Sequence, residues 1–279
     1  MLLFGDLFRT MALRNRIAII HNLAKSGGTI ISRSMGAMNS ILLFSEIHPC
    51  GPSMIRLLLD TPELSRNYDI RYQAQAWYGI DDSGISEGES FVQVLRAITE
   101  RASSMNRTVV LRSWSHIDFL GIPFTNPSGV CGLTQALEAH FELRHIGVLR
   151  HPVDQWLSMR TRLVYKDITL NNYLAGYGRF IQQDHVERWL TYESFVLDPD
   201  AFLKAASQML RIEFDPYWSS HWQENSRITG DRMASGPVVR EIRLGPKRPV
   251  NQSLLDQFWA SRAYHEILSA TGYKHPVAS

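Results

Sequence analysis

The sequence predicts an α/β fold, in which a single domain spanning residues 1–279 is built on a central parallel sheet of about five strands flanked by helices. Short apolar runs end in polar or turn residues and are followed by segments with helical spacing, a pattern typical of parallel sheets covered by helices. The 279 residues, 44% of them hydrophobic, are enough to bury a sizeable core.

Five apolar runs are the expected strands, and they lie at 16–21, 41–45, 108–111, 145–149 and 187–191. Apolar residues at helical spacing predict a helix over 199–210, and another is expected around 89–101. The stretch between the second and third strands, residues 60–106, is polar and contains glycines. We expect it to be an insertion or lid near the bound substrate.

Charge and cysteine content exclude several functional classes. A net charge of +2 is too small to indicate a nucleic-acid-binding surface. Cys50 and Cys131 are far apart and lack metal-ligand spacing, so no metal and no disulfide framework is expected. Residues 1–14 lack the apolar core of a signal peptide, and no later segment approaches the roughly 18 apolar residues of a membrane span. We expect a cytoplasmic protein with no membrane partner; the sequence does not indicate its oligomeric state.

A phosphate-binding loop follows the first strand. The strand leads into Lys25, Ser26, Gly27, Gly28 and Thr29, and an apolar helical stretch continues from Ile30. A strand, a glycine turn and a helix together present backbone N–H groups and a helix N-terminus to a phosphate. In the common nucleoside-triphosphate loop the lysine follows the glycines, whereas Lys25 precedes them. This order argues against a kinase or NTPase.

A second anion-binding motif follows the fourth strand. Arg150 stands directly after the apolar run, and Ser158 lies eight residues further on. A guanidinium group suits a phosphate dianion bidentately, and a serine hydroxyl adds one donor. On its own, an arginine directly after a strand is equally consistent with an ion pair at the strand end, so Arg150 and Ser158 are at this point candidates for a second phosphate site.

These motifs resemble those of the sulfotransferases that use 3′-phosphoadenosine-5′-phosphosulfate (PAPS). Lys-Ser-Gly-Gly-Thr at 25–29 is similar to the family's 5′-phosphosulfate loop, although Ala24 stands where many members have proline. Arg150 and Ser158 have the spacing of the family's 3′-phosphate motif, and residues 192–199 resemble a further family segment. The resemblance extends over about residues 17–250.

The resemblance implies PAPS as sulfonyl donor and 3′-phosphoadenosine 5′-phosphate (PAP) as product, with a small-molecule acceptor and no metal. Lys25 would stabilise the leaving phosphate. The residues implied in donor binding are Lys25, Ser26, Gly27, Gly28, Thr29, Ile30, Arg150, Ser158, Tyr192 and Arg248.

The catalytic base has two candidates, both after predicted strands. Glu46 lies 21 residues after Lys25, and several saccharide sulfotransferases have a catalytic glutamate at about this distance; His48 follows as a possible helper. His116 follows the third strand, where members that sulfate phenols and alcohols carry a histidine base. Both candidates remain open at this point.

The acceptor is less clearly indicated. Aromatic residues suited to an acceptor pocket are Trp77, Tyr78, Trp114 and Tyr165, and acidic residues of the expected insertion are Asp69, Asp81, Asp82, Glu87 and Glu89. An acidic pocket would favour an amine or guanidinium natural product, sulfated on nitrogen or on a hydroxyl. Two other functions compete with this interpretation: an ATP-dependent small-molecule kinase and a non-catalytic nucleotide-binding module.

Overall fold

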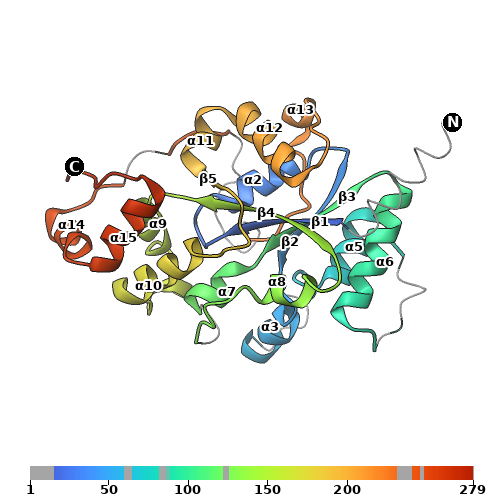
Figure 1. Ribbon diagram of the computed structural model, residues 1–279, viewed down its shortest axis with the longest axis horizontal. Coiled ribbons are helices and arrows are strands. Elements are labelled where there is room, and N and C mark those ends of the chain that lie inside the picture. The colour runs from blue at the N-terminus through green and yellow to red at the C-terminus, as the bar shows by residue number, and fades with distance from the viewer. Residues whose placement is uncertain are drawn as a thin grey trace.

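Five parallel strands form the centre of the molecule in the order β2-β3-β1-β4-β5 (Figure 1). The strands are β1 (Arg16–Asn22), β2 (Ile41–Ile47), β3 (Thr108–Ser113), β4 (Glu142–Leu149) and β5 (Trp189–Thr191). They coincide with the five predicted runs to within a few residues, and the predicted fold class is confirmed. The computed structural model describes residues 16–59, 65–81, 86, 88–121, 126–230, 241–245 and 248–278. The expectation for residues 1–14 lies outside these ranges.

One face of the sheet carries Ala18 and Ile20 of β1 and is covered by helices that follow the phosphate loop and β5. Phe202 and Leu203 pack against this face. The covering helices are α2 (Gly28–Met35), α11 (Tyr192–Leu197), α12 (Pro199–Leu210) and α13 (Trp218–His221), which Figure 1 shows on one side of the strands. Helix α12 has the bounds predicted from its spacing, since Asp198 caps its first turn and Pro199 begins it.

The opposite face carries Ile17 and Ile19 and holds the larger core. Its helices are α5 (Ile70–Tyr78), α6 (Phe91–Ser104), α7 (Ser115–Leu120), α8 (Gly132–Leu137), α9 (Pro152–Met159), α10 (Leu170–Ile181), α14 (Gln252–Trp259) and α15 (Arg262–Thr271). A short helix, α3 (Gly51–Leu59), and a 3₁₀ turn, η1 (Leu163–Tyr165), lie near the strand ends. Because both faces are covered, the central strands are almost continuously buried.

Residues 60–106, expected as an insertion or lid, contain α5 and α6 in their described part. Ile70 and Ala74 of α5, and Val94, Leu95 and Ile98 of α6, belong to the larger core. The two helices pack on β2 and β3 respectively. This segment thus contributes to the folded core, and its action as a lid stays a prediction.

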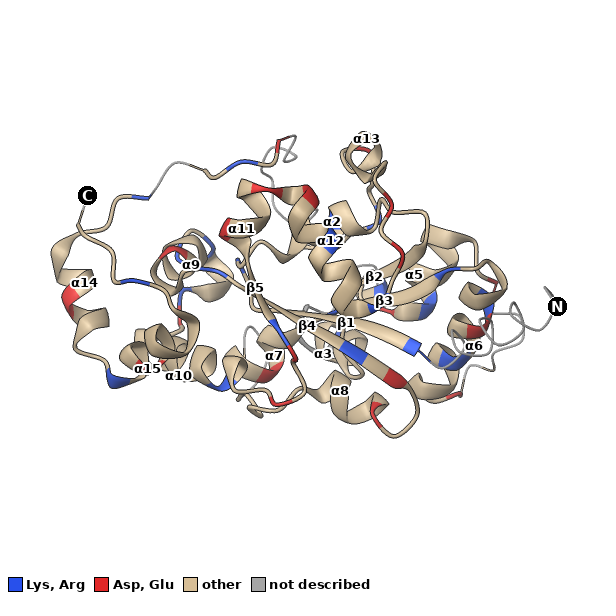
Figure 2. Cartoon of the chain, turned by 45° about the horizontal axis from the view of Figure 1, so that its top comes forward, with Lys and Arg blue, Asp and Glu red and all other residues tan. Residues whose placement is uncertain are grey.

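The strand order fixes where a ligand can bind. After β1 the chain crosses to β2 on one side, and β4 and β5 lie on the other side of β1. Ligands of open parallel sheets bind outside the carboxyl ends of the strands at such a switch point. At the amino ends, by contrast, Arg16, Arg144 and Arg211 surround Glu142 in a group of ion pairs, and Figure 2 shows basic and acidic segments side by side there.

Among the described residues, no helix has both the length and the apolar character needed to cross a membrane.

Candidate active site

The turn between β1 and α2, the predicted phosphate cradle, presents backbone N–H groups that have no acceptor within the helix. Gly27 is the N-cap of α2 with φ 87°, and its missing side chain leaves the first turn without a side-chain cap. The first helical bond is donated by the Ile31 N–H to the Gly27 carbonyl, at 3.2 Å. The N–H groups of Gly28, Thr29 and Ile30 therefore have no acceptor within the helix. Their partial positive charge and the helix dipole suit a phosphate.

Two glycines are required because the cradle is tightly packed. A Cβ on Gly27 would lie 2.1 Å from Cδ2 of the Tyr192 ring, and one on Gly28 would lie 2.3 Å from Cγ of Asn22. Neither position admits a side chain without displacing its neighbour. Lys25 has φ 63°, a left-handed conformation that costs a non-glycine residue about 1–3 kcal/mol. Ser26 is buried and donates its hydroxyl to the Leu23 carbonyl at 2.8 Å.

Arg150, at the carboxyl end of β4, lies against this cradle. Its Nη1 donates to the Lys25 carbonyl at 3.2 Å, and its guanidinium lies 4.9 Å from the centre of the Tyr192 ring. Burial raises the pKa of Tyr192, while the positive charges of Arg150 and Arg248 act to lower it. The structure thus brings the phosphate loop, Arg150 and Tyr192 together, and the role of Arg248 in donor binding stays a prediction.

Ser158 is buried on α9, the helix that follows Arg150. One turn earlier, Gln155 Nε2 donates to the Ala24 carbonyl at 2.6 Å, which fixes α9 against the phosphate loop. The Ser158 carbonyl accepts a hydrogen bond from the Thr161 hydroxyl at 2.8 Å. Its hydroxyl as a phosphate ligand stays a prediction.

Glu46 lies on the other side of the cradle, at the carboxyl end of β2. Its backbone is left-handed, with φ 55°, at a break in the pairing of β2 with β3 between Phe44 and Ile47. Its Oε1 lies 3.4 Å from Nη2 of Arg112, and its buried Oε2 has no hydrogen-bond partner among the described residues. Glu46 thus combines a left-handed backbone with a carboxylate that has one oxygen without a described partner, and its role as a base stays a prediction.

Arg112 connects Glu46 to the phosphate loop, and sequence reasoning missed it. It is only 2% exposed and donates to the Thr29 hydroxyl at 3.1 Å, the Ser45 hydroxyl at 2.8 Å and the Thr229 carbonyl at 3.1 Å. The signal was present, because an arginine closing the apolar run 108–111 has to be paired if it is buried.

His116 is held in a form that does not suit a base. Its Nε2 accepts a hydrogen bond from the Trp114 indole N–H at 2.6 Å. Because indole only donates, the neutral ring carries its proton on Nδ1 and its Nε2 lone pair is already engaged. Burial, with the nearby Arg112 charge, lowers the pKa of His116 to about 3.

His48 is likewise fixed by its neighbours. The Cys50 N–H donates to Nδ1 at 3.1 Å, so the proton resides on Nε2, which faces Asp118 Oδ1 at 3.2 Å. Asp118 also accepts from the Gly132 N–H at 3.0 Å. These contacts give His48, two residues after Glu46, a defined tautomer with its proton on Nε2.

A pocket next to His48 is lined by Tyr68, Asp69 and Glu89, among others. Trp114 stacks on Tyr68, with ring centres 4.4 Å apart. Burial, and after it the negative charge of Glu46, raises the pKa values of both Tyr68 and Tyr165.

Not every residue expected at the acceptor side lies there. Tyr78, another expected pocket residue, instead hydrogen-bonds through its hydroxyl to the backbone of Leu43 in β2, where it supports the sheet. Asp82 and Glu87 lie outside the described residues.

Comparison with known proteins identifies the fold. No family model and no curated protein matches the sequence. Among solved structures, the sulfotransferase domain from the curacin biosynthetic pathway is similar, with a TM-score of 0.61, 17% identity, and coverage of 94% of this chain and 99% of that chain. The sulfotransferase domain from the Synechococcus PCC 7002 olefin synthase has a TM-score of 0.56, 15% identity, and coverage of 94% and 96%. The chain has the sulfotransferase fold.

Proposed function

We propose that the chain is a sulfotransferase that transfers a sulfonyl group from PAPS to a hydroxyl, amine or guanidinium group of a small-molecule acceptor. The observation that carries the proposal is the contact between two anion-binding elements, the uncapped N-terminus of α2 and Arg150, which donates to the Lys25 carbonyl at 3.2 Å. The fold shared with the two sulfotransferase domains supports the same conclusion.

The residues present fit a donor with two separate phosphate groups. The first-turn N–H groups of α2, with Lys25 before them, suit the 5′-phosphosulfate, and Arg150 with Arg248 suits the 3′-phosphate. Tyr192 offers a flat ring between Gly27 and Arg150 for the adenine side. ATP has no 3′-phosphate, so a kinase would leave Arg150 without a phosphate to bind. A non-catalytic binding module would not account for the strained backbone of Glu46.

The donor supplies an activated sulfonyl group whose leaving group is a phosphate oxygen. Lys25 would place its ammonium charge near that oxygen and stabilise the negative charge that develops there. Glu46 would accept the proton of the acceptor at Oε2, because this oxygen has no partner among the described residues. Arg112 would hold Glu46 in place through Oε1, at 3.4 Å.

Glu46 is preferred to His116 as the base on geometry. His116 Nε2 is occupied by the Trp114 N–H and its pKa is about 3, so it is a weak proton acceptor. We assign His116 to the wall of the acceptor side and His48 to a supporting role beside Glu46.

The acceptor site is proposed at the pocket lined by His48, Tyr68, Asp69 and Glu89. Its charged lining residues are Asp69, Glu89 and Arg71, so the pocket offers two carboxylates and one guanidinium group to a polar small molecule with hydrogen-bonding groups. Both cysteines are free thiols, which suits the reducing cytoplasm in which we propose the enzyme acts.

The test is sulfonyl transfer measured by mass spectrometry, with PAPS and a panel of phenols, alcohols, amines and guanidines. The wild type should add one sulfonyl group to at least one acceptor. Lys25→Met should lower the rate by about 10²–10³, the typical cost of removing a group that stabilises transition-state charge. Lys204→Met, on the exposed side of α12, is the matched control and should leave the rate unchanged. Phosphoryl transfer from ATP in place of sulfonyl transfer would reject the proposal.

A further inference from the structure

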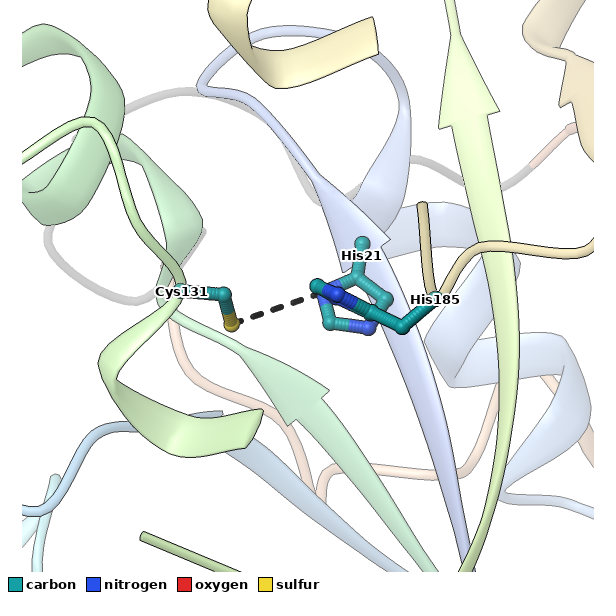
Figure 3. Close-up of side chains that lie close together, drawn as sticks. All are labelled: His21, Cys131 and His185. Carbon is teal, nitrogen blue, oxygen red and sulfur yellow. Dashed lines mark hydrogen bonds between the residues drawn. The ribbon is translucent and has the colours of Figure 1, made fainter. Parts of the chain in front are cut away.

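A second cluster of reactive side chains lies on the face of β1 that carries Ile17 and Ile19. Its members are His21 at the end of β1, Cys131 directly before α8, and His185 in the loop that precedes β5 (Figure 3). One nitrogen of each histidine and the cysteine sulfur all lie within 4.8 Å of one another. Cys131 and His21 are buried, and His185 is partly buried. The proposed sulfonyl transfer makes no use of this cluster.

The cluster has ligand-like geometry. Cys131 Sγ lies 3.8 Å from Nδ1 of His21. Bonds of the usual zinc length would hold two tetrahedral ligands roughly 3.3–3.8 Å apart. Cys131 Sγ and His21 Nδ1 already have this separation. The ligand atoms that are furthest apart, at up to 4.8 Å, would have to approach by about 1 Å.

His145 orients the first ligand from behind. Nε2 of His21 lies 2.9 Å from Nδ1 of His145, and the two rings stack with centres 5.2 Å apart. When the Cys131 thiol donates to Nδ1 of His21, the proton of His21 must be on Nε2, where it is donated to His145. Metal-binding histidines are held in this way, by a hydrogen bond from the ring nitrogen that does not bind the metal.

His185 is also held by a neighbour. The Thr134 hydroxyl oxygen, one turn into α8 from Cys131, lies 3.3 Å from Nε2 of His185. The cluster is therefore braced by side chains of β4 and α8, and it joins three segments that are distant in the sequence.

We propose that His21, Cys131 and His185 bind a divalent transition-metal ion of the zinc type, with His145 as the positioning residue for His21. One thiolate and two imidazoles form a donor set that zinc and cobalt prefer over calcium or magnesium. Binding replaces the thiol proton of Cys131, which is released to solvent. The ion joins β1, α8 and the loop before β5, so its expected effect is on stability. This proposal is independent of the proposed sulfonyl transfer.

The site also touches the acceptor side. Gly132, next to Cys131, donates its N–H to Asp118 at 3.0 Å, and Asp118 faces His48. A metal ion that fixes Cys131 would therefore also restrain Gly132 and, through Asp118, the ring of His48, which lines the proposed acceptor pocket.

The experiment uses the full chain without a histidine tag, stripped of metal by a chelator and titrated with Co²⁺. We expect one equivalent to produce a thiolate-to-cobalt charge-transfer band together with the visible bands of tetrahedral cobalt. Zn²⁺ should abolish both and raise the melting temperature, because an ion that binds only the folded state stabilises it. A wild type that shows no charge-transfer band, or gains no stability from Zn²⁺, overturns the proposal.

Matched variants locate the site. Cys131→Ser, a near-isosteric change, should remove the charge-transfer band, whereas Cys50→Ser, at the exposed second thiol, should retain it. His185→Gln should weaken binding, and His140→Gln, at an exposed histidine, should not. His145→Phe should lower the affinity by about 10–100-fold, as is usual for a residue behind a metal ligand. Circular dichroism of each metal-free variant establishes folding, and a band that survives Cys131→Ser but not Cys50→Ser would contradict the assignment.

Discussion

The two ends of the parallel sheet differ in how their polar groups are satisfied. At the amino ends, Glu142 is paired with three arginines, and its hydrogen bond from Arg144, at 2.6 Å, holds its pKa below the usual value. At the carboxyl ends, the first turn of α2 has no cap and Glu46 has a buried oxygen without a described partner. Nε of Arg16 and Nε of Arg144 are also buried without a hydrogen-bond partner among the described residues, so the contrast lies in the two carboxylates. Glu142 is paired through both oxygens, whereas Glu46 keeps one oxygen without a described partner.

Backbone conformation shows the same contrast. Lys25, Glu46, Asn106 and Arg211 all have positive φ. Asn106 and Arg211, near the amino ends, follow or end helices α6 and α12, where a left-handed residue is a normal terminator. Lys25 and Glu46 end no helix. Their strain, about 1–3 kcal/mol each, is unrelated to helix termination and coincides with the residues to which we assign the chemistry.

The largest expected effect is at Glu46. Glu46→Gln keeps the shape and the contact with Arg112 but removes the proton acceptor, and the rate of sulfonyl transfer should fall by about 10²–10⁴. His116→Gln preserves an acceptor for the Trp114 N–H and should lower the rate only a few-fold. Single-turnover rates of the two variants decide between the bases: a larger loss in His116→Gln than in Glu46→Gln would reverse the assignment.

A smaller effect is expected in the cradle itself. Gly27→Ala places a methyl group at φ 87° and against the Tyr192 ring, which must move from its place in the proposed donor site, so PAP binding should weaken by about tenfold, or about 1.4 kcal/mol. Gly79→Ala is the control, because Gly79 also has positive φ, at 64°, but nothing lies within 4 Å of its Cβ position. Both variants should lose stability in urea unfolding. Equal PAP affinity in the two would show that the cradle does not contact the donor.

Residues at the two ends of the sheet should affect the free energy of unfolding in different pH ranges. The pKa of His116 falls from 6.5 in the unfolded chain to about 3 in the fold, so its contribution to stability is complete above pH 6.5 and is lost as pH falls toward 3. Glu142, whose folded pKa is below 4.5, loses its contribution only below that value. Between pH 6 and 4, His116→Gln should therefore reduce the slope of unfolding free energy by up to about 1.4 kcal/mol per pH unit. Identical slopes for wild type and variant in urea titrations would refute the neutral, buried state of His116.

The smallest effect is expected at the amino ends. Arg144→Met removes partly exposed ion pairs to Glu142 and Glu187, and such pairs are worth about 0–1 kcal/mol. Thermal unfolding should shift slightly and the transfer rate should not change. A marked loss of activity would mean that the amino ends are coupled to the chemistry.

Local patterns explain which parts the sequence could predict. The strands and the phosphate loop depend on consecutive residues, such as the apolar run at 16–21 followed by Lys25 and two glycines, so their placement needed no tertiary information. Helix α12 was equally clear, because its cap and its spacing lie in one segment.

Contacts between distant segments could not be predicted. Arg112 of β3 meets Thr29, Ser45 and Thr229 only after strand β2, helix α2 and a later loop are assembled around it. The cluster of His21, Cys131 and His185 has no short spacing to detect, which is why cysteine spacing alone indicated no metal site. The orientation of His116, decided by one hydrogen bond from Trp114, is likewise a product of packing.

The most direct test of the central claim is calorimetric titration of the purified chain with PAP, 5′-AMP and ATP, on the wild type and on Arg150→Gln. We expect tight PAP binding that is lost without the 3′-phosphate and is weakened by about 10–100-fold in Arg150→Gln, because charge-assisted hydrogen bonds are worth about 1.5–3 kcal/mol. Preference for ATP, or PAP binding that is indifferent to Arg150, would contradict the central claim.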